Sequence, residues 1–263
     1  MTRLRAFAFL LWVGLLALES APARAQATAT IAAASDLKFA LDEIAAAFRT
    51  QTGQSLRLSY GSSGNFMRQI AQDAPFELFL SADESFVFQL ADQNRTVDRG
   101  VLYAIGRIVL FVPTGSPLQV DAQLMDLRRA LTDGRLRRFA IANPEHAPYG
   151  RAAKQALTSA GLWEAVQGHL VLGENVSQAA QFAVSGSAQG GIFAYSLALA
   201  PPFAGAGRHV LIPESQHQPL RQRMVLTRKA GAVARAFFTY LQQPPARAVL
   251  RRYGFVLPGE AGN

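Results

Sequence analysis

The 263-residue sequence contains no cysteine, which excludes disulfide cross-links, thiolate metal sites and cysteine nucleophiles. Lysine is scarce, since only three of the 26 basic residues are Lys. After residue 18, no apolar run approaches the ~20 residues that a membrane-spanning helix needs. Half of the residues are hydrophobic and 17% are charged, which is typical of a folded globular protein and excludes a disordered or fibrous chain.

The N-terminal segment carries the longest apolar run of the sequence. Two arginines precede this run at residues 6–18, and the small residues Ala23 and Ala25 follow it two positions apart. A basic start, a short apolar run and small residues at this spacing are typical of a secretory signal peptide. We therefore predict that residues 1–25 are a signal peptide cleaved near Ala25, and that the protein is exported.

The formal net charge of +8 suggests nucleic acid as a partner, but the distribution of the arginines does not. Five arginines lie between residues 128 and 138, preceded by Asp126 and interrupted by Asp133, and no aromatic residue is interleaved before Phe139. Single-stranded nucleic acid needs aromatic side chains for stacking. We predict no nucleic-acid partner and a solvated basic surface, with a docking patch as the alternative.

Strand-like apolar runs alternate with helical stripes along the predicted mature chain. Leu37, Leu41, Ile44 and Phe48, for example, are spaced four, three and four residues apart and share one side of a helix. This alternation predicts an α/β fold with mainly parallel sheets and helices on both faces. The predicted strands are 28–34, 56–60, 77–80, 107–113, 139–142, 169–172, 191–194, 209–212 and 224–227.

No Pro/Ser-rich linker divides this long chain, which favours two interleaved lobes connected by crossover strands. The predicted crossovers are residues 108–112 and 209–213. The first lobe then comprises residues 26–110 plus 210–263, and the second comprises residues 111–209. Ligands collect in the cleft between such lobes, at the carboxyl ends of strands.

Four predicted strands run directly into a turn that begins a helix, at Ser35-Asp36 and within residues 61–65, 143–150 and 173–178. A helix N-terminus presents unpaired N–H groups and the positive end of the helix dipole, so it accepts an anion. Two such termini from each lobe predict a site that encloses a small anion without charged side chains. For any one of them alone, an ordinary N-cap is the alternative.

Motifs for catalysis are missing. Residues 61–65 (GSSGN) depart from the nucleophile elbow G-x-S-x-G at the last position. The four histidines lack the helical spacing that pairs metal ligands, and no phosphate-binding or dinucleotide-binding glycine loop is present. We predict that the protein is not an enzyme. An exported serine hydrolase that uses Ser63 or Ser35 with a distant histidine is the alternative.

Six blocks spread over nearly the whole predicted mature chain resemble the periplasmic molybdate-binding proteins of ABC importers. The most distinctive block is residues 143–150 (NPEHAPYG), and the others are residues 32–35, 62–70, 74–83, 191–194 and 252–255. The resemblance implies the type II periplasmic-binding-protein fold. That fold has two doubly wound α/β domains, joined by two crossover strands, with the ligand cleft between them.

The resemblance also implies the binding residues. Ser35 and Ser63 of the first lobe would donate hydroxyl and backbone hydrogen bonds to the oxyanion, and Tyr149 and Val176 of the second lobe would donate backbone N–H groups. A tyrosine that binds the ligand in some relatives falls on Ala194 here. We expect the Tyr149 hydroxyl to replace it.

Two neighbouring residues are not expected to bind. Tyr195 follows Ala194 and should lie on the opposite face of a strand. Asp36 follows Ser35, and an acid beside a dianion is unfavourable, so we expect it to point away from the site.

The implied function is the capture of molybdate, and also tungstate, by a periplasmic monomer that delivers it to an ABC permease in the inner membrane. Molybdate is a doubly charged tetrahedral ion without a proton at neutral pH, so its site needs hydrogen-bond donors and no acceptors. We expect no cofactor and no catalytic residue. Molybdenum would be present only within the bound oxyanion, with no side chain coordinating the metal. Sulfate or an organic carboxylate is the alternative ligand.

Overall fold

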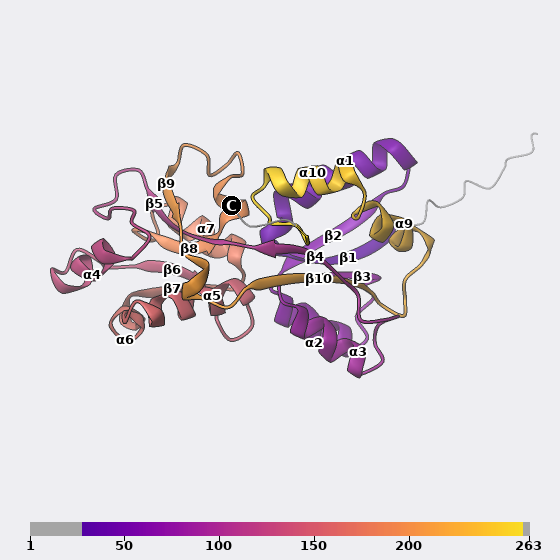
Figure 1. The fold of residues 1–263 in the computed structure, drawn as a ribbon, viewed down its shortest axis with the longest axis horizontal. Coiled ribbons are helices and arrows are strands. Elements are labelled where there is room, and N and C mark those ends of the chain that lie inside the picture. Colours follow the sequence, from indigo (N-terminus) through magenta and orange to yellow (C-terminus); the bar gives the residue numbers. More distant parts are fainter. Residues whose placement is uncertain (1–27, 260–263) are drawn as a thin grey trace, which may run out of the picture.

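The computed structural model describes residues 28–259, so the predicted signal peptide lies outside the described part of the chain. These residues form two α/β lobes, each built on a five-stranded sheet (Figure 1). The predicted fold class is confirmed. Within residues 28–259, no helix combines the length and the apolar character needed to cross a bilayer.

The sheet of the first lobe has mainly parallel strands. β1 pairs in parallel with β2 and β3, whereas β10 runs antiparallel to β3 and β4. The strand order is β2 (Leu56–Gly61), β1 (Ala29–Ala34), β3 (Leu78–Ser81), β10 (Leu220–Leu226) and β4 (Val101–Gly106). Strand β4 is missing from the predicted strands, because this half-exposed run directly precedes the stronger apolar run that begins at Ile108.

Helices cover both faces of this sheet (Figure 1). Alternate strand residues face opposite helical layers, so Ile31 packs with one layer and Ala32 with the other. The predicted apolar stripe of α1 is buried, from Leu37 to Phe48. One layer contains α1 (Lys38–Thr52), α9 (Ala232–Tyr240) and α10 (Pro244–Arg252), and the other contains α2 (Ser63–Ala71) and α3 (Glu84–Asp92).

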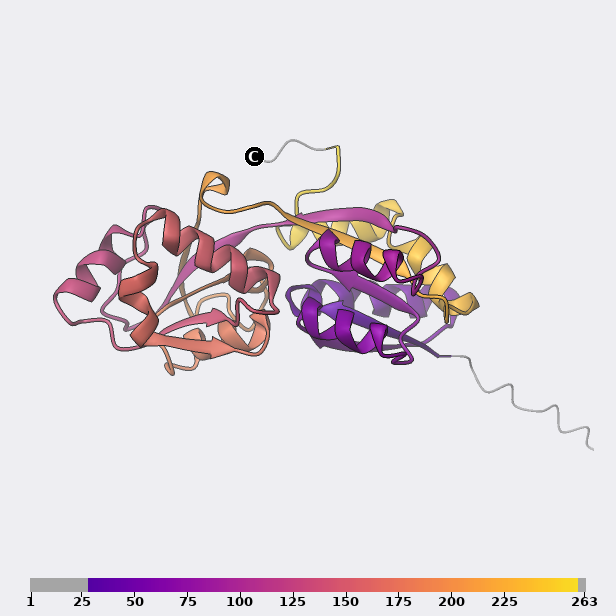
Figure 2. The same ribbon diagram turned by 90° about the horizontal axis from the view of Figure 1, so that it is seen from below.

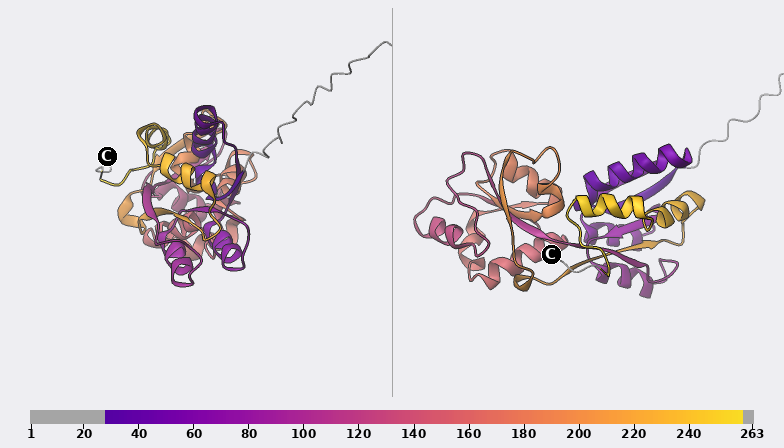
Figure 3. Two further views of the ribbon diagram at one scale, coloured as in Figure 1. Left: turned by 90° about the vertical axis from the view of Figure 1, so that its right-hand side faces the viewer. Right: turned by 45° about the horizontal axis from the view of Figure 1, so that its top comes forward.

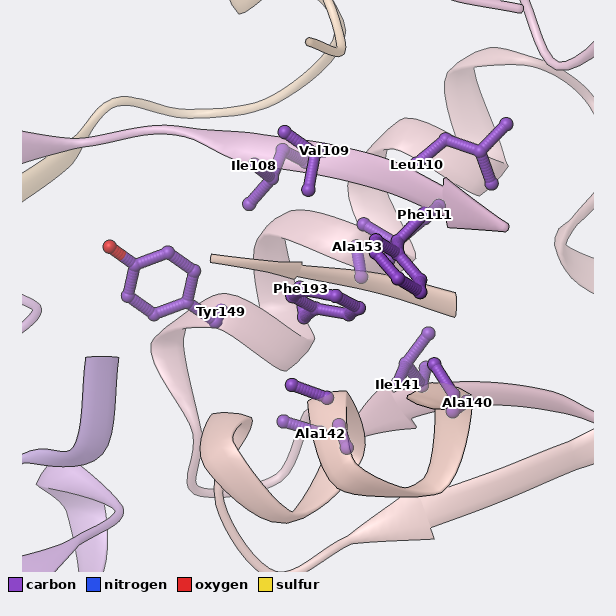
Figure 4. Close-up of a cluster of buried hydrophobic side chains, with 14 of the residues drawn as sticks. Ile108, Val109, Leu110, Phe111, Ala140, Ile141, Ala142, Tyr149, Ala153 and Phe193 are labelled. Carbon is purple, nitrogen blue, oxygen red and sulfur yellow. The ribbon is translucent and has the colours of Figure 1, made fainter. Parts of the chain in front are cut away.

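The second lobe repeats the same plan. β6 is parallel to β7 and β8, and β5 is antiparallel to β8 and β9. Its core includes the buried rings of Phe111 and Phe193, whose centroids lie 5.3 Å apart (Figure 4). The strand order is β7 (Leu170–Gly173), β6 (Phe139–Ala142), β8 (Gly191–Ala194), β5 (Ile108–Pro113) and β9 (Gly207–Leu211). The helices are α4 (Met125–Thr132), α5 (Pro148–Ser159), α6 (Trp163–Val166), α7 (Val176–Val184) and α8 (Tyr195–Ala198).

The chain passes between the lobes twice, at Arg107 between β4 and β5 and at residues 212–219 between β9 and β10. Both passages run along one side of the molecule (Figures 2 and 3). The predicted boundaries place residues 108–110 and 210–211 in the first lobe. In the structure these residues pair within the second sheet, because β5 lies between β8 and β9.

Candidate functional site

Four helix starts lie at the carboxyl ends of β1, β2, β6 and β7, as predicted. A 3₁₀ turn (Ser35–Leu37) follows β1, and α2, α5 and α7 follow the other three strands. Helix α5 begins at Pro148, within the predicted range of residues 143–150. Proline is favoured at the first helical position because its fixed φ suits the helix. An N–H at this position would have no acceptor within the helix, so proline loses no hydrogen bond by lacking one.

The four predicted binding residues, Ser35, Ser63, Tyr149 and Val176, line one small cavity between the lobes. Its volume is about 10 Å³ in this arrangement, close to the minimum that holds a single water molecule. Among the described residues that line it, Asp36 is the only one with an ionisable carboxyl, and none is Lys or Arg. The cavity therefore offers hydroxyls and helix N-termini, without a basic side chain.

The hydroxyl oxygens of Ser35 and Ser63 already accept backbone hydrogen bonds. The N–H of Ser177 donates to Ser35 Oγ at 3.2 Å, and the N–H of Ala82 donates to Ser63 Oγ at 3.0 Å. A hydroxyl carries one proton and two acceptor lone pairs. Since both oxygens act as acceptors here, each O–H proton remains to be donated to a ligand.

Backbone N–H groups come from the second lobe. Tyr149 and Val176 stand in the first turns of α5 and α7, where an N–H has no intrahelical acceptor. Within residues 28–259, neither N–H donates to another group. Gly150 allows α5 to start this close to β6, because a Cβ there would lie 2.2 Å from the carbonyl oxygen of Ala142.

The Tyr149 hydroxyl does not have the expected role. It donates to Asp36 Oδ2 at 2.9 Å and accepts from Gln222 Nε2 at 2.9 Å, so its one proton is used within the protein. Figure 4 shows the ring beside the core of the second lobe, with the hydroxyl pointing away from that core. Burial and the nearby Asp36 charge raise the pKa of Tyr149 well above its usual value, so the phenol stays neutral. The prediction of a Tyr149 hydroxyl donor was wrong, and its backbone N–H remains the predicted donor.

Asp36 does not point away from the site, contrary to expectation. It is 1% exposed and lines the cavity. Gln222 Nε2 donates to Asp36 Oδ2 at 2.7 Å, and the Tyr103 hydroxyl in turn donates to Gln222 Oε1 at 2.6 Å. Burial raises the pKa of Asp36 to about 6, against the lowering effect of the hydrogen bonds from Gln222 and Tyr149. An acid in the first turn of a helix is usually solvated, so the sequence contains no signal for this burial.

Ala194 and Tyr195 are not among the residues that line the cavity. Tyr195 begins α8, and its ring centroid is 5.7 Å from that of His209. It is the first residue of a short helix rather than the strand residue that the sequence analysis assumed.

Several hydrogen bonds between the lobes surround the cavity. Ser177 Oγ donates to the carbonyl oxygen of Ser35 at 2.7 Å, and the N–H of Gly64 donates to the carbonyl oxygen of His146 at 3.0 Å. Ser62 Oγ donates to the same His146 oxygen at 3.0 Å. These contacts could not be predicted from the sequence because they depend on how the two lobes face each other.

The hydrolase alternative receives no support from Ser35 or Ser63, whose hydrogen bonds involve backbone groups. Ser62 Oγ lies 2.8 Å from His146 Nδ1, but Ser62 is the N-cap of α2 and accepts from the N–H of Asn65 at 3.4 Å. The role of Ser62 as the N-cap of α2 accounts for its position beside His146 without a catalytic role. The described residues also contain no group of three His, Asp or Glu side chains placed to hold a metal ion.

A larger cavity of about 400 Å³ shares Ala82 and Pro148 with the small one. Its charged side chains are already paired: Arg151 binds Asp83, and Arg221 Nε donates to Glu84 Oε1 at 2.6 Å. These arginines are neutralised by carboxylates within the protein. The small cavity is therefore the better candidate for binding an anion.

Two α/β lobes with helix starts converging on a small cavity between them are the architecture of a solute-binding protein. Residues 29–256 match the family described as bacterial extracellular solute-binding protein, and the chain belongs to this family.

Among known relatives, the chain is 36% identical to the molybdate-binding protein ModA of Rhodobacter capsulatus over 217 residues, which cover 81% of this chain and 82% of the relative. It is 34% identical to ModA of Azotobacter vinelandii over 250 residues, covering 94% and 95% of the two chains. The solved structure of the Azotobacter vinelandii periplasmic molybdate-binding protein matches with a TM-score of 0.80 and 32% identity, covering 88% of this chain and 99% of that one. The resemblance found in the sequence is confirmed.

Proposed function

We propose that the protein is the periplasmic substrate-binding component of a molybdate ABC importer and that it also binds tungstate. The observation that carries this proposal is the convergence of four helix starts on one cavity without basic side chains. The names of the two ModA relatives add the identity of the anion. In this proposal, Ser35 and Ser63 donate hydroxyl hydrogen bonds, and Tyr149 and Val176 donate backbone N–H groups.

Neutral donors suit a carrier that must release its ligand. An ion pair buried in a closed cleft is costly to break, whereas hydrogen bonds to helix N-termini are exchanged for water when the lobes separate. Closure would involve a hinge at the two crossings, Arg107 and residues 212–219. The permease would then recognise the closed form. The protein would act as a monomer and catalyse no reaction.

Calorimetric titration of the purified protein with molybdate, tungstate, sulfate and phosphate tests the proposal. We expect tight binding of molybdate and tungstate and much weaker binding of sulfate and phosphate. Tight binding of sulfate with none of molybdate would contradict the assignment. A thermal-shift measurement with the same four anions is an independent check, because a specific ligand raises the unfolding midpoint.

A further inference from the structure

Asp36 places a carboxyl in the wall of a cavity that is otherwise suited to an anion. It is 1% exposed and lines the same cavity as Ser35 and Ser63. An ionised carboxylate next to a bound dianion would be a like-charge pair in a buried environment, where repulsion is poorly screened. The described lining residues include no Lys or Arg that offsets this charge.

The two oxygens of Asp36 have different surroundings. Oδ2 accepts two hydrogen bonds, from the Tyr149 hydroxyl at 2.9 Å and from Gln222 Nε2 at 2.7 Å. Oδ1 is buried and has no hydrogen-bond partner among the described residues. A buried polar atom without a partner is costly and is rare in native proteins. Because Oδ2 is directed at Tyr149 and Gln222, Oδ1 is the oxygen left to meet a ligand.

We propose that Asp36 is a specificity-determining residue of the anion site, and that it carries a proton on Oδ1 and donates this hydrogen to the bound oxyanion. One proton is then taken up from solvent with each fully ionised molybdate. The proposal rests on the proposed molybdate site and adds a neutral carboxylic-acid donor to it. The bound anion stays fully ionised, and the only bond formed is the O–H bond of Asp36.

The surroundings of Asp36 favour this protonation. Burial already raises its pKa to about 6, and a bound dianion would raise the pKa further because it disfavours a second negative charge. The titratable side chains that interact with Asp36 in the described chain are the phenols of Tyr103, on β4, and Tyr149, on α5. Burial and the Asp36 charge raise the pKa of both phenols well above the usual value, so both remain neutral. Gln222, on β10, is uncharged.

A protonated Asp36 would distinguish two kinds of tetrahedral anion, those without a proton and those that carry one. Molybdate, tungstate and sulfate carry no proton at neutral pH, so they need Asp36 as a donor. Hydrogen phosphate carries its own proton and would need Asp36 as an ionised acceptor, leaving a carboxylate beside a dianion. Binding of the first kind takes up a proton, and binding of the second kind does not.

Calorimetry with sodium molybdate at pH 6, 7 and 8, at constant ionic strength and in two buffers of different ionisation enthalpy, measures the proton directly. We expect Kd to rise about tenfold per pH unit above pH 6, because free Asp36 is increasingly ionised there and must regain a proton to bind. The dependence of the binding enthalpy on the buffer should give an uptake of about one proton at pH 8.

Asp36→Asn supplies a neutral amide donor at every pH. Its Kd for molybdate should be nearly independent of pH and lower than the wild-type Kd at pH 8. Asp92→Asn removes the same charge from an exposed residue of α3 that pairs with Arg99, and it should keep the wild-type pH dependence. His146 also approaches the site, because its Nδ1 lies 2.8 Å from Ser62 Oγ. Because Asp36→Asn leaves His146 in place, loss of the pH dependence in this variant assigns the proton to Asp36.

A measurement without ligand checks that Asp36→Asn is folded and tests the same carboxyl. The pKa of Asp36 is raised in the folded protein from 3.8 to about 6, so its contribution to stability is present below pH 3.8 and is lost as the pH rises through 6. The thermal midpoint of the wild type should therefore fall over this window by more than that of Asp36→Asn.

The possible failures are distinguishable. If the wild type binds molybdate with the same Kd at pH 6 and pH 8 and takes up no proton, the role of Asp36 is overturned while the proposed function stands. Loss of molybdate binding at every pH in a folded Asp36→Asn variant would also overturn it, since an amide should replace the protonated acid. If the wild type binds no molybdate at any pH, the proposed function fails, and the role of Asp36 fails with it.

Discussion

The two lobes share one plan but contribute different chemistry to the cavity. In the sheet of each lobe, three parallel strands lie beside an antiparallel strand, β10 in the first lobe and β5 in the second. Each of these antiparallel strands begins directly after the chain has passed from the other lobe. The first lobe offers the side-chain hydroxyls of Ser35 and Ser63, whereas the second offers backbone N–H groups at Tyr149 and Val176. Residue type therefore indicates the site only in the first lobe. In the second lobe, the proposed donor is a backbone N–H, so it depends on the position at a helix start and not on the side chain.

The lobes also differ in charge at the site. The first lobe contributes Asp36, and the second stabilises it through the Tyr149 hydroxyl. The Tyr149 side chain of the second lobe thus binds the Asp36 carboxyl of the first lobe. The predicted contact of Tyr149 with the ligand is made by its backbone N–H. If the lobes close around the anion as proposed, the contact between Tyr149 and Asp36 would connect their closure with the protonation of the site.

Val176→Pro should have the largest effect on molybdate binding, because it removes the backbone N–H of residue 176, which every substitution other than proline retains. Val176 is the first residue of α7, where proline is favoured, and Asn175 before it is extended with φ −148° and ψ 173°, as a residue preceding proline requires. We expect calorimetry to show molybdate binding weaker by about 2–3 kcal/mol, the value of a hydrogen bond to a charged group. Val176→Ala keeps the N–H and should bind almost as tightly as the wild type. Equal affinities of the two variants would remove this N–H from the site.

Ser63→Ala should have the next largest effect and tests the hydroxyl contribution of the first lobe. The substitution removes the donor and also leaves the N–H of Ala82 without its acceptor. We expect molybdate binding to weaken by about 1–2 kcal/mol. Ser187→Ala, in a surface loop of the second lobe, is the matched control and should bind like the wild type. An unchanged affinity in Ser63→Ala would limit the site to backbone donors in both lobes.

Ser177→Ala should have the smallest effect, because it acts on the contact between the lobes rather than on the ligand. It removes the hydrogen bond from Ser177 Oγ to the carbonyl oxygen of Ser35, while the N–H of Ser177 still reaches Ser35 Oγ. A loss of about 0.5–1.5 kcal/mol in molybdate binding is expected from one such bond. Ser185→Ala, at the other end of α7, controls for changes in the helix itself. Should the two variants bind equally, closure does not depend on this contact.

Much of the fold could be predicted from periodicity. The apolar stripe of α1 agrees with the structure because burial of one helix side imposes a 3.6-residue period on the sequence. The short apolar runs of β1, β6 and β8 agree because these strands are buried on both faces and are therefore continuously apolar. Strand β4 escaped prediction because its half-exposed residues carry a weaker pattern than the adjoining β5. The boundaries between the lobes were displaced by a few residues because hydrogen bonding, which an apolar run does not reveal, determines which sheet a strand joins.

The four helix starts and the serines beside them were determined by the sequence itself. Small and polar residues directly after a buried strand favour a turn and the start of a helix. Only the tertiary structure decided what faces these residues. It buried Asp36, directed the Tyr149 hydroxyl to that carboxyl instead of to the cavity, and joined Ser177 to Ser35 across the lobes. The physical reason is that the pKa of a carboxyl and the partner of a hydroxyl depend on groups brought together from distant parts of the chain. Asp36 and Gln222, for example, are separated by 186 residues in the sequence, and their contact exists only once β10 has joined the sheet.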